Sequence, residues 1–275
     1  TQDEINKGKN DLLKKMNLKN CYVRPIVWRG SNQMGLSTNY ADIHVAIAIW
    51  DDWASYFKIE DRLDGLKLII TESVFSMDGK IAPLGELCKL KTKYKCLLYV
   101  DEAHAIGVLG ENQAGLASEH GSCDIVVAPL GKALAATGAI VACNQDVKRY
   151  LINKCRGFIY STALPPFMMA WIESAILFCQ ESNALAEGVV KNAQQFKEIL
   201  TRKGYTVYGD VHIVALIAGE NKTSIKWATH LRDQGYWVSP VRYPTVPKGT
   251  ARLRFSITAT HDKKTLNALG DKCDF

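Results

Sequence analysis

The sequence predicts an α/β protein with a mostly parallel sheet, followed by a smaller α+β domain. Short apolar runs rich in β-branched residues recur between helix-like stretches, and each run is only a few residues long. Such continuous runs are typical of strands buried on both faces of a parallel sheet. The predicted strands are HVAIAIW (44–50), LKLIIT (66–71), CLLYVDE (96–102), DIVVA (124–128) and GAIVAC (138–143).

The pattern changes near residue 166, which predicts a second domain. Two long segments there carry apolar residues at three- and four-residue spacing, which indicates amphipathic helices. The second of them ends in a basic turn and Gly204, and the neighbouring prolines at 165 and 166 mark the boundary. Shorter strands and one more helix follow: HIVALIAG, IKWATHLRDQG, YWVSPVRYP and ARLRFSIT.

Composition excludes several classes of protein. No run of 18 uncharged apolar residues occurs and the first residues are charged, so neither a membrane span nor a secretion signal is expected. The eight cysteines are scattered without a CxxC pair, which predicts reduced thiols, a cytoplasmic location and no metal site. The net charge of +6 comes from interleaved cations and anions, so no nucleic-acid partner is expected.

The stretch LLYVDEAHAIGVLG places Asp101 at the end of an apolar strand, with His104 in the following turn. Open α/β sheets bind ligands at this position. A DEAH sequence at a strand end also occurs in helicase ATPases, which need a GxxxxGK[ST] phosphate loop. The three Gly-Lys pairs of this chain are followed by Asn10, Ile81 and Ala133, so the ATPase interpretation fails.

The alternative is a pyridoxal-phosphate (PLP) site. A carboxylate at a strand end can pair with the pyridinium nitrogen, and a lysine must bind the cofactor aldehyde as a Schiff base. Lys132 is suitable, because it follows the next predicted strand on a turn with Gly131 and Gly138. Taken singly, these residues have ordinary explanations: Asp101 as a cap carboxylate, Gly131-Lys132 as a solvent-facing turn, and His104 as a histidine that donates to a backbone carbonyl.

Five ordered blocks resolve this choice. Together they resemble the α-oxoamine synthase family of PLP fold type I over about 210 residues, from about residue 66 onward. Within that family they are most similar to the 8-amino-7-oxononanoate synthases of biotin biosynthesis. The blocks are TESVFSMDGKIAPLGEL, VDEAHAIGVLGENQAG, LGKALAATGA, IYSTALPP and PTVPKGTARLRFSITATH.

The resemblance implies specific roles. Lys132 forms the Schiff base, Asp101 binds the pyridine nitrogen, His104 hydrogen-bonds the phenolic oxygen, and Ser76 faces the cofactor. Arg254 binds the carboxylate of the amino-acid substrate, which suits a guanidinium fork. Arg252 lies on the same face of the strand by alternation. We do not assign Arg252 to the site, because a strand-edge salt bridge explains it equally well.

The implied activity is a PLP-dependent acyl transfer. L-alanine condenses with pimeloyl-CoA or a pimeloyl carrier protein and loses carbon dioxide, with Lys132 as the base that removes the α-proton. The resemblance also implies a homodimer, and it gives the chain an incomplete PLP-binding large domain over 66–165 and a small domain over 166–275.

Two features depart from the family. Pro129 stands where a threonine usually holds the cofactor phosphate, and proline has neither a hydroxyl nor an N–H. Residues 1–65 instead resemble an internal piece of a branched-chain (class IV) aminotransferase, in which Tyr22 and Arg24 lie near the substrate. We interpret the chain as a fusion near GLKLII, with a divergent synthase start as the alternative.

Such a junction leaves three functional hypotheses open. The first is the acyl transfer, the second a catalytically impaired remnant, and the third branched-chain transamination directed by residues 1–65. It also predicts that hydrophobic faces and sheet edges of the synthase part lose their covering.

Overall fold

The structure, a computed structural model, describes residues 2–16, 21–30, 42–51 and 68–275. The chain divides into two compact units, Thr1–Leu66 and Lys67–Phe275. The assignment of three segments with boundaries after residues 65 and 165 remains a prediction.

The first unit contains one helix and a β-hairpin. Helix α1 (Gln2–Met16) has two acidic residues in its first turn, which favour a helix N-terminus. Strands β1 (Cys21–Gly30) and β2 (Asp42–Asp51) pair antiparallel. The run HVAIAIW is therefore a strand, as predicted, but its place in a parallel sheet was wrong, because its partner is the neighbouring β1. The side chains of Tyr22 and Arg24 lie outside the described residues.

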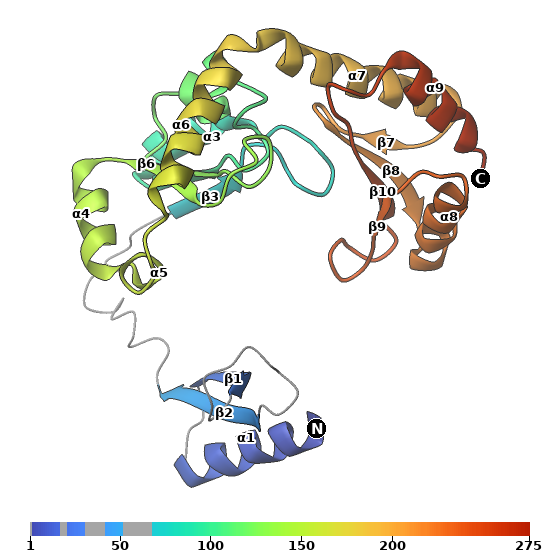
Figure 1. Cartoon of the computed structure of the whole chain (residues 1–275). Helices are drawn as coiled ribbons and strands as arrows, with labels where there is room; N and C mark the ends of the chain where they lie inside the picture. The colour runs from blue at the N-terminus through green and yellow to red at the C-terminus, as the bar shows by residue number, and fades with distance from the viewer. Residues whose placement is uncertain (1, 17–20, 31–41, 52–67) are drawn as a thin grey trace. The chain divides into compact units, whose positions relative to one another are not determined.

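The second unit begins with a four-stranded sheet in the order β3-β4-β5-β6 (Figure 1). The first three strands are parallel, as predicted. The fourth is antiparallel to β5, because residues 130–138 are too few for a crossover connection. All four predicted strands are confirmed: β3 (Leu68–Glu72), β4 (Leu97–Asp101), β5 (Ile125–Pro129) and β6 (Ala139–Cys143).

Burial in this sheet, which we call the first sheet, is uneven. Leu98 and Val100 of β4 are fully buried and pack near helix α3 (Leu84–Tyr94). The outer strands differ, since Ile70 of β3 is 67% exposed and Val141 of β6 is 43% exposed. The expectation of burial on both faces is therefore wrong for β3 and β6, while the exposed edge agrees with the prediction of lost covering.

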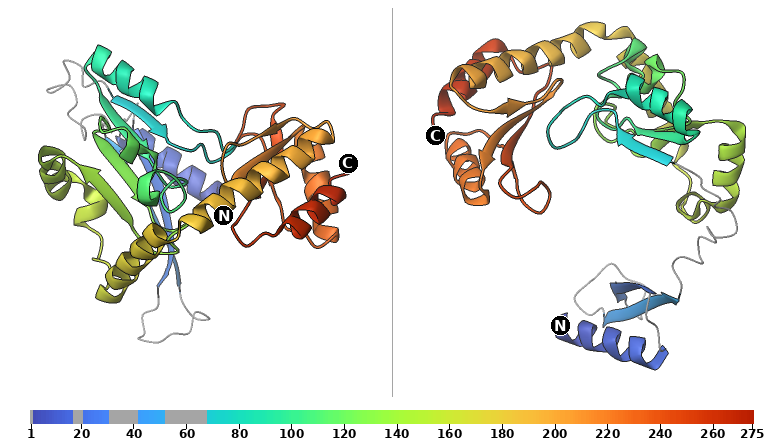
Figure 2. Two further views of the ribbon diagram at one scale, coloured as in Figure 1. Left: turned by 90° about the horizontal axis from the view of Figure 1, so that it is seen from above. Right: turned by 180° about the vertical axis from the view of Figure 1, so that it is seen from behind.

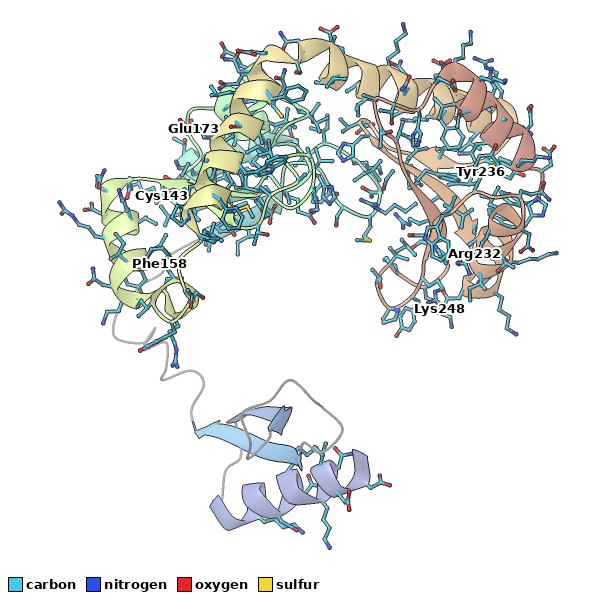
Figure 3. The ribbon with its side chains drawn as sticks, in the orientation of Figure 1. Cys143, Phe158, Glu173, Arg232, Tyr236 and Lys248 are labelled. Atoms are coloured by element: carbon cyan, nitrogen blue, oxygen red, sulfur yellow. The ribbon has the colours of Figure 1, made fainter. Side chains whose placement is uncertain are left out.

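The helices after β6 also expose apolar side chains. Helix α6 begins at Pro166, where proline suits the first helical turn, and buries Ile172. Trp171 and Phe178 of α6 are more than half exposed, as is Phe158 of α5 (Figure 3). The helices of this region are α4 (Gln145–Lys154), α5 (Arg156–Ile159), α6 (Pro166–Glu181) and α7 (Asn183–Arg202).

A second, antiparallel sheet follows, with the strand order β7-β8-β10-β9 (Figure 1), and Figure 2 shows it from two further directions. Its apolar side chains form a continuous core with α7, α8 and α9, in which Phe196, Leu216 and Leu253 are fully buried. Its elements are β7 (Val207–Tyr208), β8 (Ile213–Gly219), α8 (Asn221–Asp233), β9 (Ser239–Val241), β10 (Ala251–Ser256) and α9 (Lys263–Lys272).

The loop at 73–81, which follows β3 of the first sheet, forms hydrogen bonds with the segment that precedes β8 of the second sheet. The N–H of Asp210 donates to the carbonyl of Gly79 (2.9 Å), and the N–H of Ile81 donates to the Asp210 carboxylate (3.2 Å). Gly79 has φ +70°, and a Cβ there would lie 2.3 Å from the carbonyl oxygen of Ile213. Only glycine permits both this backbone conformation and this close approach.

Candidate active site

The end of β4 carries two adjacent carboxylates with different surroundings. Glu102 is fully buried, accepts hydrogen bonds from Ser73 Oγ (2.6 Å) and the N–H of Ala117, and has its pKa raised by burial. Asp101 is partly exposed and accepts from the N–H of Ala103 (2.8 Å). Glu102 therefore stabilises the loop after β4 through its hydrogen bonds, and Asp101 is the carboxylate that could bind a ligand.

Lys132 lies on the turn that follows the neighbouring strand β5. Asp101, the last residue of β4, pairs with Val127 of β5 in the sheet register. Asp101 and Lys132 are therefore positioned by the ends of two adjacent parallel strands. The N–H of Ala135 donates to the Lys132 carbonyl (3.1 Å), and that of Leu130 donates to the Gly138 carbonyl (3.0 Å). The predicted turn is confirmed, but the Lys132 side chain is exposed, so the described residues do not form the dry environment expected around it.

His104 lies in the turn after β4 and beside a second histidine, His212, which precedes β8. Their ring centroids are 5.8 Å apart. Burial, together with the charges of Lys132 and Arg254, lowers the pKa of His104 to about 4. The alternative role of His104 as a donor to a backbone carbonyl is not seen within the described residues. Its ring lines a cavity instead.

Arg254 projects from β10 toward the loop at 73–81. Its Nε donates to the carbonyl of Ser76 (2.6 Å) and its Nη1 to Ser256 Oγ (2.8 Å), while burial lowers its pKa. A guanidinium has five N–H donors, and the other three of Arg254 have no partner within the described structure. The two flanking residues, Leu253 and Phe255, belong to the core of the second sheet, which fixes the direction of the arginine.

Arg252 shares this face, as the alternation predicted. It is buried and donates to the carbonyl and hydroxyl of Thr250 (3.0 and 3.2 Å), with Asp78 4.0 Å away. The guanidinium of Arg252 is therefore bound within the protein, which agrees with a structural role outside the site.

A cavity of about 850 Å³ unites Lys132, His104, His212 and Arg254. None of the described residues that line it is an aspartate or glutamate, so its charged groups are cationic. Helices α6 and α7 supply an apolar wall: Trp171, Ala175, Phe178, Cys179, Leu185 and Val189.

Two predicted residues stand apart from this cavity in the described structure. The N–H of Ser76 donates to the Glu72 carboxylate (3.1 Å), and its hydroxyl lies 3.5 Å from the same group. Neither Ser76 nor Asp101 is among the described residues that line the cavity. Their roles at the cofactor remain predictions.

The donor set fits PLP. An amine, an imidazole and a guanidinium from three separate elements share one space of a size typical for cofactor sites. Pro129 ends β5 opposite Ala139, so this position offers no hydroxyl for the cofactor phosphate.

The sequence alone does not predict a role for His212. It stands in VHIVALIAG, an apolar run in which a single histidine suggests a core position, and the other cavity residues are far away along the chain. Only the pairing of β8 with β10 brings it to Arg254.

Other kinds of site are absent from the described part of the chain. Among those residues no cluster of three potential ligands could hold a metal ion, and the seven cysteines whose side chains are described are free thiols. No described helix combines the length and apolar character that a membrane crossing requires.

Comparison with known proteins identifies the family. Residues 51–272 match the family model of class I and II aminotransferases. An 8-amino-7-oxononanoate synthase from Haemophilus ducreyi is 43% identical over 211 residues, covering 74% of this chain and 54% of the relative. One from Geobacter sulfurreducens is 40% identical over 213 residues, covering 75% and 54%.

Solved structures agree. A serine palmitoyltransferase from S. paucimobilis with a bound PLP-myriocin aldimine superimposes with a TM-score of 0.71 at 28% identity, covering 79% of this chain and 57% of that one. An 8-amino-7-oxononanoate synthase from Francisella tularensis gives 0.68 at 30% identity, covering 78% and 64%. The predicted fold and resemblance are confirmed.

The chain spans about half the length of the curated relatives it matches. The kinship of residues 1–65 with class IV aminotransferases stays a prediction, and the family match begins within that segment, at residue 51. The chain belongs to the class I and II aminotransferase family of PLP-dependent enzymes, and within it is similar to 8-amino-7-oxononanoate synthases.

Proposed function

We propose that this chain catalyses, in the cytoplasm, the PLP-dependent condensation of L-alanine with a pimeloyl thioester to give 8-amino-7-oxononanoate and carbon dioxide. The thioester is pimeloyl-CoA or a pimeloyl carrier protein. The observation that carries the proposal is the meeting of Lys132, His104 and Arg254, from three elements, at one cavity without acidic lining residues.

PLP, when bound, supplies the electron sink for the charge that develops at the α-carbon of the amino acid. Lys132 would hold the cofactor aldehyde, and its Nζ would then accept the α-proton of L-alanine. Asp101 would pair with the ring nitrogen.

The remaining residues bind and orient. Three N–H donors of Arg254 have no partner among the described residues and would bind the substrate carboxylate, and its hydrogen bonds to Ser76 and Ser256 fix its position. His104 is kept neutral by burial and neighbouring cations, so it can donate one hydrogen bond without adding charge. The apolar wall of α6 and α7 limits the access of water on one side.

The test is product formation by the full chain. Incubated with PLP, L-alanine and pimeloyl-CoA, it should release carbon dioxide and form 8-amino-7-oxononanoate, detected by mass spectrometry. Lys132→Ala should abolish both signals, whereas Lys154→Ala, on α4 and outside the cavity, should leave them unchanged. Absence of product from the wild-type chain under these conditions excludes the proposal.

Two other hypotheses predict different results. A catalytically impaired remnant, favoured by Pro129 and by the exposed faces of the first sheet, would fold without releasing carbon dioxide. A branched-chain aminotransferase would form a keto acid from leucine with 2-oxoglutarate. The proposed homodimer is tested separately by light scattering on the purified chain.

A further inference from the structure

His212, directly before β8, lines the cavity. Its carbonyl accepts a hydrogen bond from the N–H of Ile257 (2.8 Å), which fixes its backbone. Its ring lines the cavity beside His104, but within the described structure its side chain forms no hydrogen bond. Most polar groups at this depth have a partner.

The two ring nitrogens differ in their surroundings. Nδ1 is buried and has no partner among the described residues. A charged imidazolium would carry an N–H at this atom, and an unpaired buried N–H costs free energy. The ring is therefore neutral in the free protein, and burial with the charges of Arg254 and Lys132 lowers its pKa to about 4. Nε2 is the nitrogen that remains to reach the cavity.

Among the described residues, the titratable groups that face His212 are the cations Lys132 and Arg254 and the neutral ring of His104. Lys132 approaches from the turn after β5, His104 from the turn after β4, and Arg254 from β10. The nearby Asp210 carboxylate is bound by the N–H of Ile81 and lies 3.7 Å from Lys197 Nζ. An anion in this corner would face the positive charges of Lys132 and Arg254, and it would offset the repulsion that keeps the ring neutral.

We propose that His212 is a substrate-binding residue that donates a hydrogen bond from Nε2 to the carboxylate held by Arg254, so that the amino acid is anchored by two residues of the second sheet. This inference rests on the proposed function and names a further residue of its substrate site. It predicts that carboxylate binding favours the protonated ring, because an opposite charge then lies next to it.

The first test needs neither cofactor nor turnover. Histidine ring signals of the full chain are followed by NMR as propionate, which carries the carboxylate of alanine without its amine, is added at several pH values. The signal that disappears in His212→Gln should move, and its pKa should rise above its starting value of about 4. Arg254→Met should remove this response, and ethylamine, a cation of similar size, should not cause it.

A His212 signal that stays unchanged at saturating propionate overturns the inference, whatever the activity of the chain. A His212 response in a chain that forms no 8-amino-7-oxononanoate supports the binding role while refuting the proposed reaction. The two failures are therefore distinguishable.

The second test separates binding from a structural role. With PLP, His212→Phe should raise the KM for L-alanine about tenfold, since a hydrogen bond to a charged group is lost, and leave the KM for the thioester nearly unchanged. His212→Gln retains a donor and should stay within about threefold of the wild type. His230→Phe, at an exposed histidine of α8, is the matched control. Equal KM values for L-alanine in the wild type and His212→Phe would overturn the inference.

Discussion

The two sheets of the second unit contribute to one cavity but are built differently. The second sheet has a continuous core in which Phe196 and Leu253 are fully buried, and it presents Arg254 from a strand fixed on both sides. The first sheet buries β4 but exposes Ile70 and Val141 on its outer strands. The residues proposed to bind the cofactor therefore lie on the part with less covering, and Arg254, proposed to bind the substrate, lies on the part with more. Stability and chemistry should respond to substitution in different places.

The largest effect expected is on turnover. Lys132→Ala should reduce the rate of carbon dioxide release about 1,000-fold or more, because both the cofactor attachment and the base are lost. The melting temperature should change little, since the side chain is exposed. A large fall in melting temperature would show that the turn after β5 has a structural role and would weaken the comparison. Calorimetry and product assays on the same preparation decide this.

The second effect is on stability and contrasts the two cores. Phe196→Ala removes a buried ring that packs edge-to-face on Phe255 at 4.9 Å, and should lower the free energy of unfolding by about 4 kcal/mol. Ile70→Ala on exposed β3 should change it by less than about 0.5 kcal/mol. Urea denaturation measures both. A comparable loss for Ile70→Ala would show that β3 is covered in solution.

The third prediction concerns the loop that joins the sheets. Gly79→Ala should cost about 3 kcal/mol, because positive φ and the approach to the Ile213 carbonyl both oppose a side chain. Gly204→Ala is the matched control, since Gly204 also has positive φ but nothing lies within 4 Å of its added Cβ. That variant should cost about 1 kcal/mol. Equal costs would mean that strain alone, and not the junction, matters at Gly79.

The smallest effect is a pH dependence that involves one histidine near each sheet. The pKa values of His104 and His212 are lowered to about 4, below the ordinary value near 6.5, so the unfolded chain binds protons that the folded chain excludes. The contribution of these two neutral histidines to the free energy of unfolding is complete above about pH 6.5, and it is lost as the pH drops toward 4. The melting temperature should fall by about 3 °C or more between pH 7 and 5. His104→Gln and His212→Gln should each reduce this fall, and an unchanged profile in both would contradict the assignment.

The sequence predicted the strands of the first sheet correctly, because buried strands require apolar, β-branched runs that are visible in one dimension. It predicted the wrong sheet for HVAIAIW, since pairing depends on the partner strand and that partner, β1, contains a proline and two arginines. It also placed Lys132, His104 and Arg254 together, through ordered motifs that span the chain. His212 carries no motif, and its role follows from a strand register that no local pattern encodes.

The neighbouring acids at the end of β4 have a consequence for how this strand can vary. Burial alternates along β4, whose last residue is Asp101, and Glu102 directly after the strand continues the alternation: Asp101 is partly exposed, whereas Glu102 is buried and accepts from Ser73. Inserting or deleting a single residue in β4 would place Asp101 in the buried position and Glu102 in the partly exposed one. Both the hydrogen bond to Ser73 and the proposed cofactor contact would then be lost. The length of the strand is therefore under tighter constraint than the apolar composition of its interior, where one aliphatic residue can replace another.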